Sequence, residues 1–543
     1  MTITDHEESE SATAVDAPSA GRREWIGLAV LALANVLYVI DLTVLKLAIP
    51  AISADLQPSS AQLLWIIDIY GFLVAGSLIT MGTLGDRIGR RKLLLIGATS
   101  FGVVSLLAAF STSAEMLIAS RALLGIAGAT LAPSTLSLLF HMFRDPRQRS
   151  VAIGMWIGSF SAGGVIGPVL GGVLLELFWW GSVFLLALPV VALLLVLGPR
   201  VLPECRDPRA GRLDLPSAAM SMAAVLAVIY GLKQLVQDDL FFMPAALGIL
   251  AGLAIGVGFV RRQRRLANPM IDVGLFRITA FNAALAINVL AIFVAIGSSL
   301  FVAQYLQLVL GLSPLQAGLW SLPPAFGFII GSQLGPRVLY RVRPAHVIAG
   351  GFALAAAGLA VLTRVGAADG LASLVTGSLV ISLGFAPVFG LTTDLIVGSA
   401  PPQRAGAAAG INETGVKLGG ALGIAILGSI GVAIYRGELS VRLPADVPAE
   451  AAAAARDTLG GAVAVAEQLP DRLGVAVLEA AREAFVRGMQ LSSVIAAVVA
   501  LGFAILVEVM LRDRPAASPD VYADAGVARA AATPCGQLEA ATR

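Results

Sequence analysis

The sequence is poor in charge and in the residues that build metal and redox sites. Only 13% of its 543 residues are charged, whereas soluble domains carry about a quarter. The two cysteines, Cys205 and Cys535, lie far apart in polar segments, which gives neither a disulfide framework nor metal-ligand spacing. The three histidines, His6, His141 and His346, fall in predicted tails or loops. These shortages argue against a metal or haem centre, and we expect no cofactor and no metal.

Several functional motifs are also missing. The sequence has no phosphate-cradling GxxxxGK[ST] string and no nucleophile with a companion base, which argues against ATP-driven transport and membrane catalysis. The net charge is only +2, and no basic, aromatic-interleaved patch indicates a nucleic-acid partner. The polar, acidic residues 1–24 lack the basic-then-apolar layout of a cleaved signal peptide. The first apolar run is therefore expected to direct insertion itself.

Apolar residues, by contrast, are abundant along almost the whole chain. They make up 57% of it, and the mean hydropathy is +0.86. A spanning helix needs about 20 mostly apolar residues, and fourteen such runs stand between polar or turn-rich segments. They lie at about 26–50, 61–83, 92–111, 116–140, 151–175, 180–199, 216–236, 241–260, 280–304, 315–336, 345–363, 371–396, 405–435 and 488–511. We expect an all-α polytopic membrane protein with 14 transmembrane helices, or two fewer if the pair at 216–260 does not span.

Basic residues mark alternate loops. With the N-terminus inside, the inner loops hold DRIGRRK, FRDPRQR, PRVLPECRDPRAGR, RRQRR and RVLYRVR. The short outer loops DLQPSS, STSAE, QDD and GLSP almost lack lysine and arginine. This asymmetry follows the positive-inside rule everywhere except at the short loop that carries Arg364. We therefore expect both termini in the cytoplasm.

A short string recurs along the chain. LGDR at 84–87 follows the second apolar run, and LGPR at 334–337 follows the tenth. Each string follows the second helix of a block of six, which predicts two six-helix halves, as in transporters whose substrate site lies between repeats near the midplane. The alternative is that any inner loop carries a similar glycine and arginine. The expected divisions are a cytoplasmic tail at 1–24, a six-helix half at 25–200, two linking helices at 201–265, a second half at 266–511 with an external insert at 436–487, and a disordered cytoplasmic tail at 512–543.

The string MGTLGDRIGRRKLLLIG at 81–97 is the most specific one. Its glycines permit close packing, and its acid and arginines can form an ion-pair cluster at an inner helix end, a latch made in one conformation and broken in another. The alternative is a basic loop that only fixes topology. The latch residues are Gly82, Gly85, Asp86, Arg87, Gly89, Arg90 and Arg91.

Two further strings lie inside apolar runs. SRALLGIAGATLAPSTLSLL places Arg121 within a span, where an arginine costs about 2.5–3.5 kcal/mol unless it faces the bundle and finds a partner. GSFSAGGVIGPVLGG predicts close helix contacts and a kink, although an ordinary small-residue packing face is the alternative. The residues of this glycine-rich helix are Gly163, Gly167, Pro168, Gly171 and Gly172.

Together these strings resemble the major facilitator superfamily. They match its G-x-L-x-D-R-x-G-R-R/K loop, its R-x-x-x-G-x-G-A string and the G-x-x-x-G-P-x-x-G-G string of its antiporters. IDLTVLKLAIP, LLWIIDIYGFLVAG, LDLPSAAM and INETGVKLGGALGIAILGSI are similar to the fourteen-span drug:proton antiporter family, the group of QacA, SmvA and LfrA. The resemblance covers about residues 24–435 and the last span. It implies the major facilitator fold, export of quaternary ammonium compounds and cationic dyes, and a link of Arg121 to proton transfer.

Three charged residues are expected at similar depth in the first, second and fourth spans: Asp41, Asp68 and Arg121. An ionisable group within a span is a functional hypothesis by default. Burial raises a carboxyl pKa and a nearby arginine lowers it, so this trio can tune a proton-binding group. The alternative is a structural acid–arginine pair. We expect Asp41 to serve proton or substrate coupling.

The remaining charges of the spans are more ambiguous. Glu413 and Lys417 are spaced i, i+4 and share a helix face; Glu413 either binds a cation or a proton, or forms a self-neutralising pair with Lys417. Asp394 can pair with Arg404. Lys46 either modulates the site or extends its ammonium to the membrane surface. Asp394, Lys46 and Lys417 are therefore predicted modulators.

The expected function is proton-driven efflux of lipophilic, cationic compounds by alternating access. The lysines in the spans favour one alternative, a proton-coupled exporter of an anionic or neutral antibiotic or metabolite. The expected partners are small-molecule drugs, protons and the lipid bilayer of the bacterial inner membrane, with the chain as a monomer.

Overall fold

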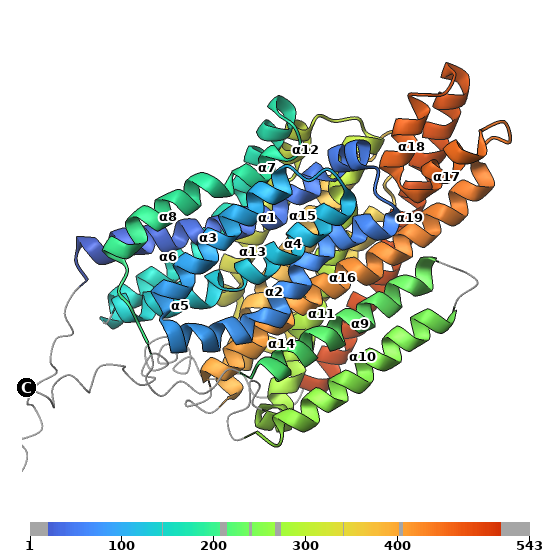
Figure 1. Cartoon of the computed structure of the whole chain (residues 1–543). Coiled ribbons are helices and arrows are strands. Elements are labelled where there is room, and N and C mark those ends of the chain that lie inside the picture. The colour runs from blue at the N-terminus through green and yellow to red at the C-terminus, as the bar shows by residue number, and fades with distance from the viewer. Residues whose placement is uncertain are drawn as a thin grey trace, which may run out of the picture.

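The computed structural model describes residues 20–143, 145–206, 214–237, 242–266, 273–339, 342–400 and 405–511. Within these ranges the chain is almost entirely helical and has no strand. Figure 1 shows long helices that run side by side along one direction. The prediction of an all-α fold is confirmed.

The helices of the first part of the chain are α1 (Arg22–Leu56), α2 (Ser60–Ile88), α3 (Arg90–Ala109), α4 (Ala114–Gly128), α5 (Leu131–Met142), α6 (Pro146–Leu177), α7 (Ser182–Leu185) and α8 (Ala187–Val201). We call them the N-terminal block. Two helices follow, α9 (Leu215–Gln237) and α10 (Phe242–Gln263).

The later helices are the 3₁₀ turn η1 (Val273–Arg277), α11 (Thr279–Gln304), the π-helical turn η2 (Tyr305–Val309), α12 (Pro314–Trp320), α13 (Leu322–Leu339), α14 (Pro344–Leu362), α15 (Leu371–Ser399), α16 (Ala405–Arg442), α17 (Ala449–Asp457), α18 (Leu459–Ala466) and α19 (Asp471–Leu511). We call α11–α16 and α19 the C-terminal block. We call the end of the bundle at residues 57–59 the outer end, following the predicted orientation, and the end at Gly89 the inner end.

Three predicted spans are each divided into two helices, and a proline explains each division. Pro133, Pro189 and Pro324 stand three or four residues beyond the breaks at 129–130, 186 and 321. A proline lacks the N–H that would bond to the carbonyl four residues earlier, and its ring clashes there. The missing bonds therefore fall at the observed breaks.

Twelve helical segments in the described part of the chain are long and apolar enough to cross a membrane. They include every predicted span except those at 216–236 and 315–336. The first of these lies on α9, whose apolar part is Leu215–Gly231, and the second is divided between α12 and α13. The chain is a multi-pass membrane protein, and the count of fourteen stays a prediction.

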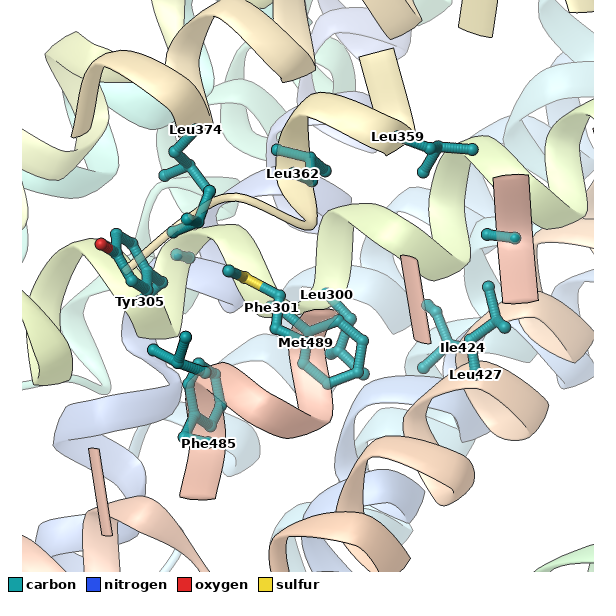
Figure 2. Close-up of a cluster of buried hydrophobic side chains, with 14 of the residues drawn as sticks. Leu300, Phe301, Tyr305, Leu359, Leu362, Leu374, Ile424, Leu427, Phe485 and Met489 are labelled. Atoms are coloured by element: carbon teal, nitrogen blue, oxygen red, sulfur yellow. The ribbon is translucent and has the colours of Figure 1, made fainter. Parts of the chain in front are cut away.

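The buried apolar side chains form two large clusters. One is made by the N-terminal block and the segment just after it, up to Cys205. The other comes mainly from the C-terminal block, and α1 and α2 add a few side chains to it. Figure 2 shows part of this second cluster, where Phe301 of α11 lies near Phe485 of α19 with ring centroids 6.0 Å apart. The predicted domain boundaries stay a prediction.

Helices α9 and α10 form a hairpin along the side of the bundle (Figure 1). Gly231 and Gly252 let the two helices approach closely, since a Cβ atom at either position would meet the backbone of the partner helix. Met222 of α9 packs on Gly76 of α2. Phe72 of α2 and Ile229 of α9 join side chains of α16 in a small cluster. The hairpin thus lies over the line where α2 meets α16.

The segment at 436–487 is helical over most of its length. Helix α16 continues to Arg442 and α19 begins at Asp471, so both extend beyond the spans expected at 405–435 and 488–511. The segment is rich in alanine, which has the highest helix propensity of all residues. Helices α17 and α18 lie at the outer end (Figure 1). There Gly460 packs on Ser53 of α1.

Candidate functional site

A buried ion pair joins α1 to α4 within the N-terminal block. Nη1 of Arg121 donates to Oδ2 of Asp41 over 2.7 Å. The side chains are only 1% and 7% exposed, respectively. Pairing of this kind removes much of the penalty of placing either charge in a span. Asp41 and Arg121 thus meet, and their role in coupling stays a prediction.

Two tyrosines extend the ion pair across the bundle. The guanidinium of Arg121 lies 4.5 Å from the ring centroid of Tyr70 on α2. The ring of Tyr70 lies 6.2 Å from that of Tyr38 on α1. Both tyrosines are buried. A cation over an aromatic face is attracted by the ring quadrupole, so Arg121 interacts with both an acid and a ring.

Helix α16 of the C-terminal block completes this network. Nζ of Lys417 lies 4.7 Å from the ring centroid of Tyr38. Glu413 stands one turn before Lys417 on the same face, and its side chain is exposed. Tyr38 also stands one turn before Asp41 on α1. We call Asp41, Arg121, Tyr70, Tyr38, Lys417 and Glu413 the central network.

Lys46 lies one to two turns outward from Asp41 on α1. Its Nζ donates to Oγ of Ser299 on α11 over 2.6 Å. Helix α1 continues ten residues beyond Lys46 to Leu56, a rise of about 15 Å. The side chain therefore spans the contact between the two blocks.

The other two predicted acids lie on α2 and α15. Asp68 is on α2 and is only 1% exposed. Asp394 is exposed near the inner end of α15. Its predicted partner, Arg404, lies outside the described residues. The hydrogen bond that the structure shows for Arg121 is the one to Asp41.

The glycine-rich helix α6 packs tightly on α1. A Cβ atom at Gly163 would lie 2.8 Å from Cβ of Val39, and one at Gly167 would lie 2.3 Å from Oγ1 of Thr43. One at Gly171 would overlap Val44 in the same way. The structure thus shows close contacts between α6 and α1 at these glycines, which the sequence predicted.

The same helix also contacts the C-terminal block at the outer end. A Cβ atom at Gly172 would lie 2.7 Å from Cα of Leu315 on α12. In the reverse direction, a Cβ atom at Gly318 of α12 would lie 2.3 Å from the carbonyl oxygen of Pro168. Helices α6 and α12 therefore touch backbone to backbone.

Hydrogen bonds between the blocks gather at the outer end as well. Nε2 of Gln307 donates to the carbonyl of Leu47 over 2.9 Å, and Oγ of Ser313 donates to Glu176 over 3.3 Å. Arg436 of α16 bonds to Oγ of Ser60 over 3.2 Å. These contacts hold α1, α2 and α6 against the C-terminal block at this end.

The predicted latch lies at the turn between α2 and α3. Gly89 has φ +109°, a conformation that L-residues rarely adopt. A Cβ atom there would also lie 2.5 Å from Oε1 of Glu204. Arg91 pairs with Glu204 at 3.5 Å, and its backbone N–H donates to the same carboxylate. The side chain of Asp86 lies outside the described residues, so Glu204 is the acid that the structure places beside this turn.

The other latch residues take different surroundings. A Cβ atom at Gly82 would meet open space, whereas one at Gly85 would meet Arg90 and Leu93. The side chain of Arg87 is exposed. The second copy of the string, at 334–337, lies at the inner end of α13. The first copy, at 84–87, lies in the same way at the inner end of α2.

Sequence reasoning missed two residues of the site. Tyr38 stands three residues before Asp41 and so shares its helix face, a signal that could have been used. Glu204 stands as an acid within the basic string PRVLPECRDPRAGR. Among the described residues, no group of three or more histidine, cysteine or acidic side chains is placed to hold a metal ion.

Comparisons with known proteins agree with this architecture. The family model described as "Major Facilitator Superfamily" matches residues 31–424. The chain is 43% identical over 490 residues to "Multidrug efflux pump LfrA" of Mycolicibacterium smegmatis, which covers 90% of this chain and 97% of that protein. It is 38% identical over 480 residues to "Methyl viologen resistance protein SmvA" of Salmonella typhimurium, with 86% and 93% covered.

A solved structure shows the same fold. It is that of a bacterial homolog of the human lysosomal transporter Spinster, in an inward-facing and unoccupied conformation. The TM-score is 0.63 at 19% identity, with 92% of this chain and 100% of that chain covered. At this identity the likeness concerns the fold alone.

Proposed function

The chain belongs to the major facilitator superfamily, and from this premise we propose that it exports lipophilic cationic compounds from a bacterial cytoplasm in exchange for protons. The chain is a transporter and not an enzyme. Both relatives are named for efflux or resistance to toxic compounds. Methyl viologen, which names one of them, is a planar organic dication. The cargo class follows from these names together with the acids and rings of the central network.

The observation that carries proton coupling is the buried pair of Asp41 and Arg121. The guanidinium stays protonated in proteins, so Asp41 is the member of the pair that can bind and release a proton. Protonation of Asp41 removes its charge and weakens the 2.7 Å bond to Arg121. The released guanidinium can then shift against the ring of Tyr70. Tyr70 contacts Tyr38, and Tyr38 contacts Lys417 of the other block, so the change reaches that block.

Transport proceeds by alternating access in this proposal. Cargo enters between the blocks from the cytoplasm or the inner leaflet while the contacts of α6 with α12 close the outer end. Protonation from outside favours cargo release, and deprotonation to the cytoplasm resets the site. The turn at Gly89 serves as a latch that differs between the two states, and the glycines of α6 allow the helix to bend.

The remaining assignments complete the proposal. The two blocks act as the two six-helix halves of a monomer in the cytoplasmic membrane, with both termini in the cytoplasm. Asp68 supports coupling from α2, and Asp394 modulates the inner end of α15. Glu413 binds cargo or a proton.

One observation favours a second candidate. Lys46 and Lys417 place two ammonium groups between the blocks. An anionic or neutral antibiotic would meet less repulsion there than a cation. A competition assay separates the two candidates. If the cargo is cationic, other organic cations will displace a bound fluorescent cation. If it is anionic or neutral, compounds of that class will be accumulated instead.

The test is ethidium uptake into everted vesicles under an imposed pH gradient. Asp41→Asn keeps an oxygen that can accept from Arg121 but cannot titrate, so proton-driven uptake should be lost. Asp41→Glu keeps the titratable group and should retain uptake. If Asp41→Asn pumps normally, Asp41 is structural and this assignment is wrong.

A further inference from the structure

Lys417 places a cation of the protein itself on an aromatic face of the central network. We propose that Lys417 is a built-in competitor for the cargo: its ammonium occupies the face of Tyr38, and a cationic cargo binds there by displacing it. This inference rests on the proposed function and deepens it, because it names the binding face and the residue that sets selectivity for cargo charge.

The surroundings of Tyr38 suit an organic cation. The ring lies one turn from Asp41 on α1, and Glu413 stands one turn from Lys417 on α16. An aromatic face near acids is the environment that binds quaternary ammonium groups. In this structure the ammonium of Lys417 takes that place, 4.7 Å from the ring centroid.

Two features distinguish Lys417 from Arg121, the other cation of the network. Arg121 is held by a 2.7 Å bond to Asp41 and is only 1% exposed. Lys417 is half-buried and carries a compact ammonium on a flexible four-carbon stem. Glu413, at i−4, offers that ammonium a second position on the exposed side of the same helix. Lys417 can therefore leave Tyr38 with an acid still within reach, whereas Arg121 cannot leave an ionised Asp41 without becoming an uncompensated buried charge.

The contact also joins the two blocks. Tyr38 belongs to α1 and Lys417 to α16, and these helices move relative to each other when the blocks rock. The contact between ring and ammonium must then lengthen or break. Cargo and Lys417 exclude each other at Tyr38, so only a cation that gains more from the ring than Lys417 loses will bind. Planar, delocalised cations meet this condition better than small, strongly hydrated ones.

The test measures ethidium affinity by fluorescence anisotropy, with the purified full-length chain in lipid nanodiscs at one pH and without a gradient. Lys417→Met keeps the length of the stem and removes the competitor, so the Kd should fall about tenfold. Lys417→Arg is the matched control that keeps the charge, and because a guanidinium also stacks on an aromatic face, its Kd should not fall below that of wild type. Lys417→Gln provides a second neutral variant with different packing.

A double-mutant cycle places the effect at the ring. Tyr38→Leu should weaken binding, and it should also cancel the gain that Lys417→Met gives, because the two changes act on one contact. If neither neutral variant binds ethidium more tightly than wild type, Lys417 is not a competitor and the inference is wrong. If wild type and all variants fail to bind ethidium, the cationic cargo of the proposed function fails together with it.

Discussion

The contact of α6 with α12 permits a sharp prediction about the conformational equilibrium. A Cβ atom at Gly172 would lie 2.7 Å from Cα of Leu315 and 2.8 Å from the carbonyl oxygen of Pro314. Carbon atoms in contact stay about 3.5 Å apart or more, so Gly172→Ala requires the two helices to separate by roughly 0.8 Å. Overpacking of this kind costs about 1–3 kcal/mol.

This cost falls only on the state in which α6 touches α12. The helices are parts of different blocks, so an outward-open state separates them and accommodates the alanine. Differential stabilisation of about 1–3 kcal/mol corresponds to a 5–150-fold change in an equilibrium constant. Gly172→Ala should therefore shift the population from the closed outer end toward the open one.

The assay is a distance distribution between spin labels at the outer end. Phe110 of the N-terminal block and Val441 of α16 are both well exposed, and they can be labelled after Cys205 and Cys535 are replaced. Gly164→Ala is the matched control on the same helix, because a Cβ atom at Gly164 would meet open space. We expect a longer distance in Gly172→Ala only. Equal distributions in both variants would refute the argument.

Two further predictions concern stability. Gly89→Ala should lower the thermal denaturation midpoint in detergent, because φ +109° and the carboxylate of Glu204 both exclude a Cβ atom. Gly82→Ala is the control and should leave the midpoint unchanged, since a Cβ atom there meets open space. Equal midpoints in the two variants would contradict this reasoning. Burial raises the pKa of the Asp214 carboxyl, but hydrogen bonds from Arg262 and Ser217 outweigh it and hold that pKa below its ordinary value. Its contribution to the α9–α10 hairpin is therefore fully present above about pH 4, the ordinary pKa of an aspartate, and is lost as pH falls through the folded pKa. Hydrogen–deuterium exchange at the start of α9 should rise at low pH in wild type. In Asp214→Asn it should already be high at pH 7. Unchanged exchange in that variant would show that the bond between Asp214 and Arg262 does not hold the hairpin.

The sequence indicated which charged residues lie within the apolar helices but not which side chains they contact. Asp41, Asp68 and Arg121 all stood out because charge is rare in apolar runs. Which acid meets the arginine depends on how each helix is rotated about its axis, and that rotation follows from packing between distant segments. Arg121 bonds to Asp41, a choice that spacing along the chain does not determine.

The same reason explains the contacts between the blocks. The i, i+4 spacing predicted a shared face for Glu413 and Lys417, but no local pattern indicated that this face meets Tyr38 of α1. Lys46 likewise has no sequence signal for Ser299, which lies 253 positions further along the chain. The glycine-rich string and the basic string, by contrast, determine local backbone structure. The helix α6 and the turn at Gly89 therefore lie at the positions that these strings predicted.

The α9–α10 hairpin makes the two flanks of this transporter unequal toward the lipid. On one flank α9 lies across the meeting line of α2 and α16, with Met222 and Ile229 packed into it. On the other flank α6 meets α12 and α13, and among the described residues no additional helix covers that line. The extra hairpin therefore covers the interface between the blocks on the α2–α16 side and, in the described part of the chain, leaves the α6–α12 side without such a cover.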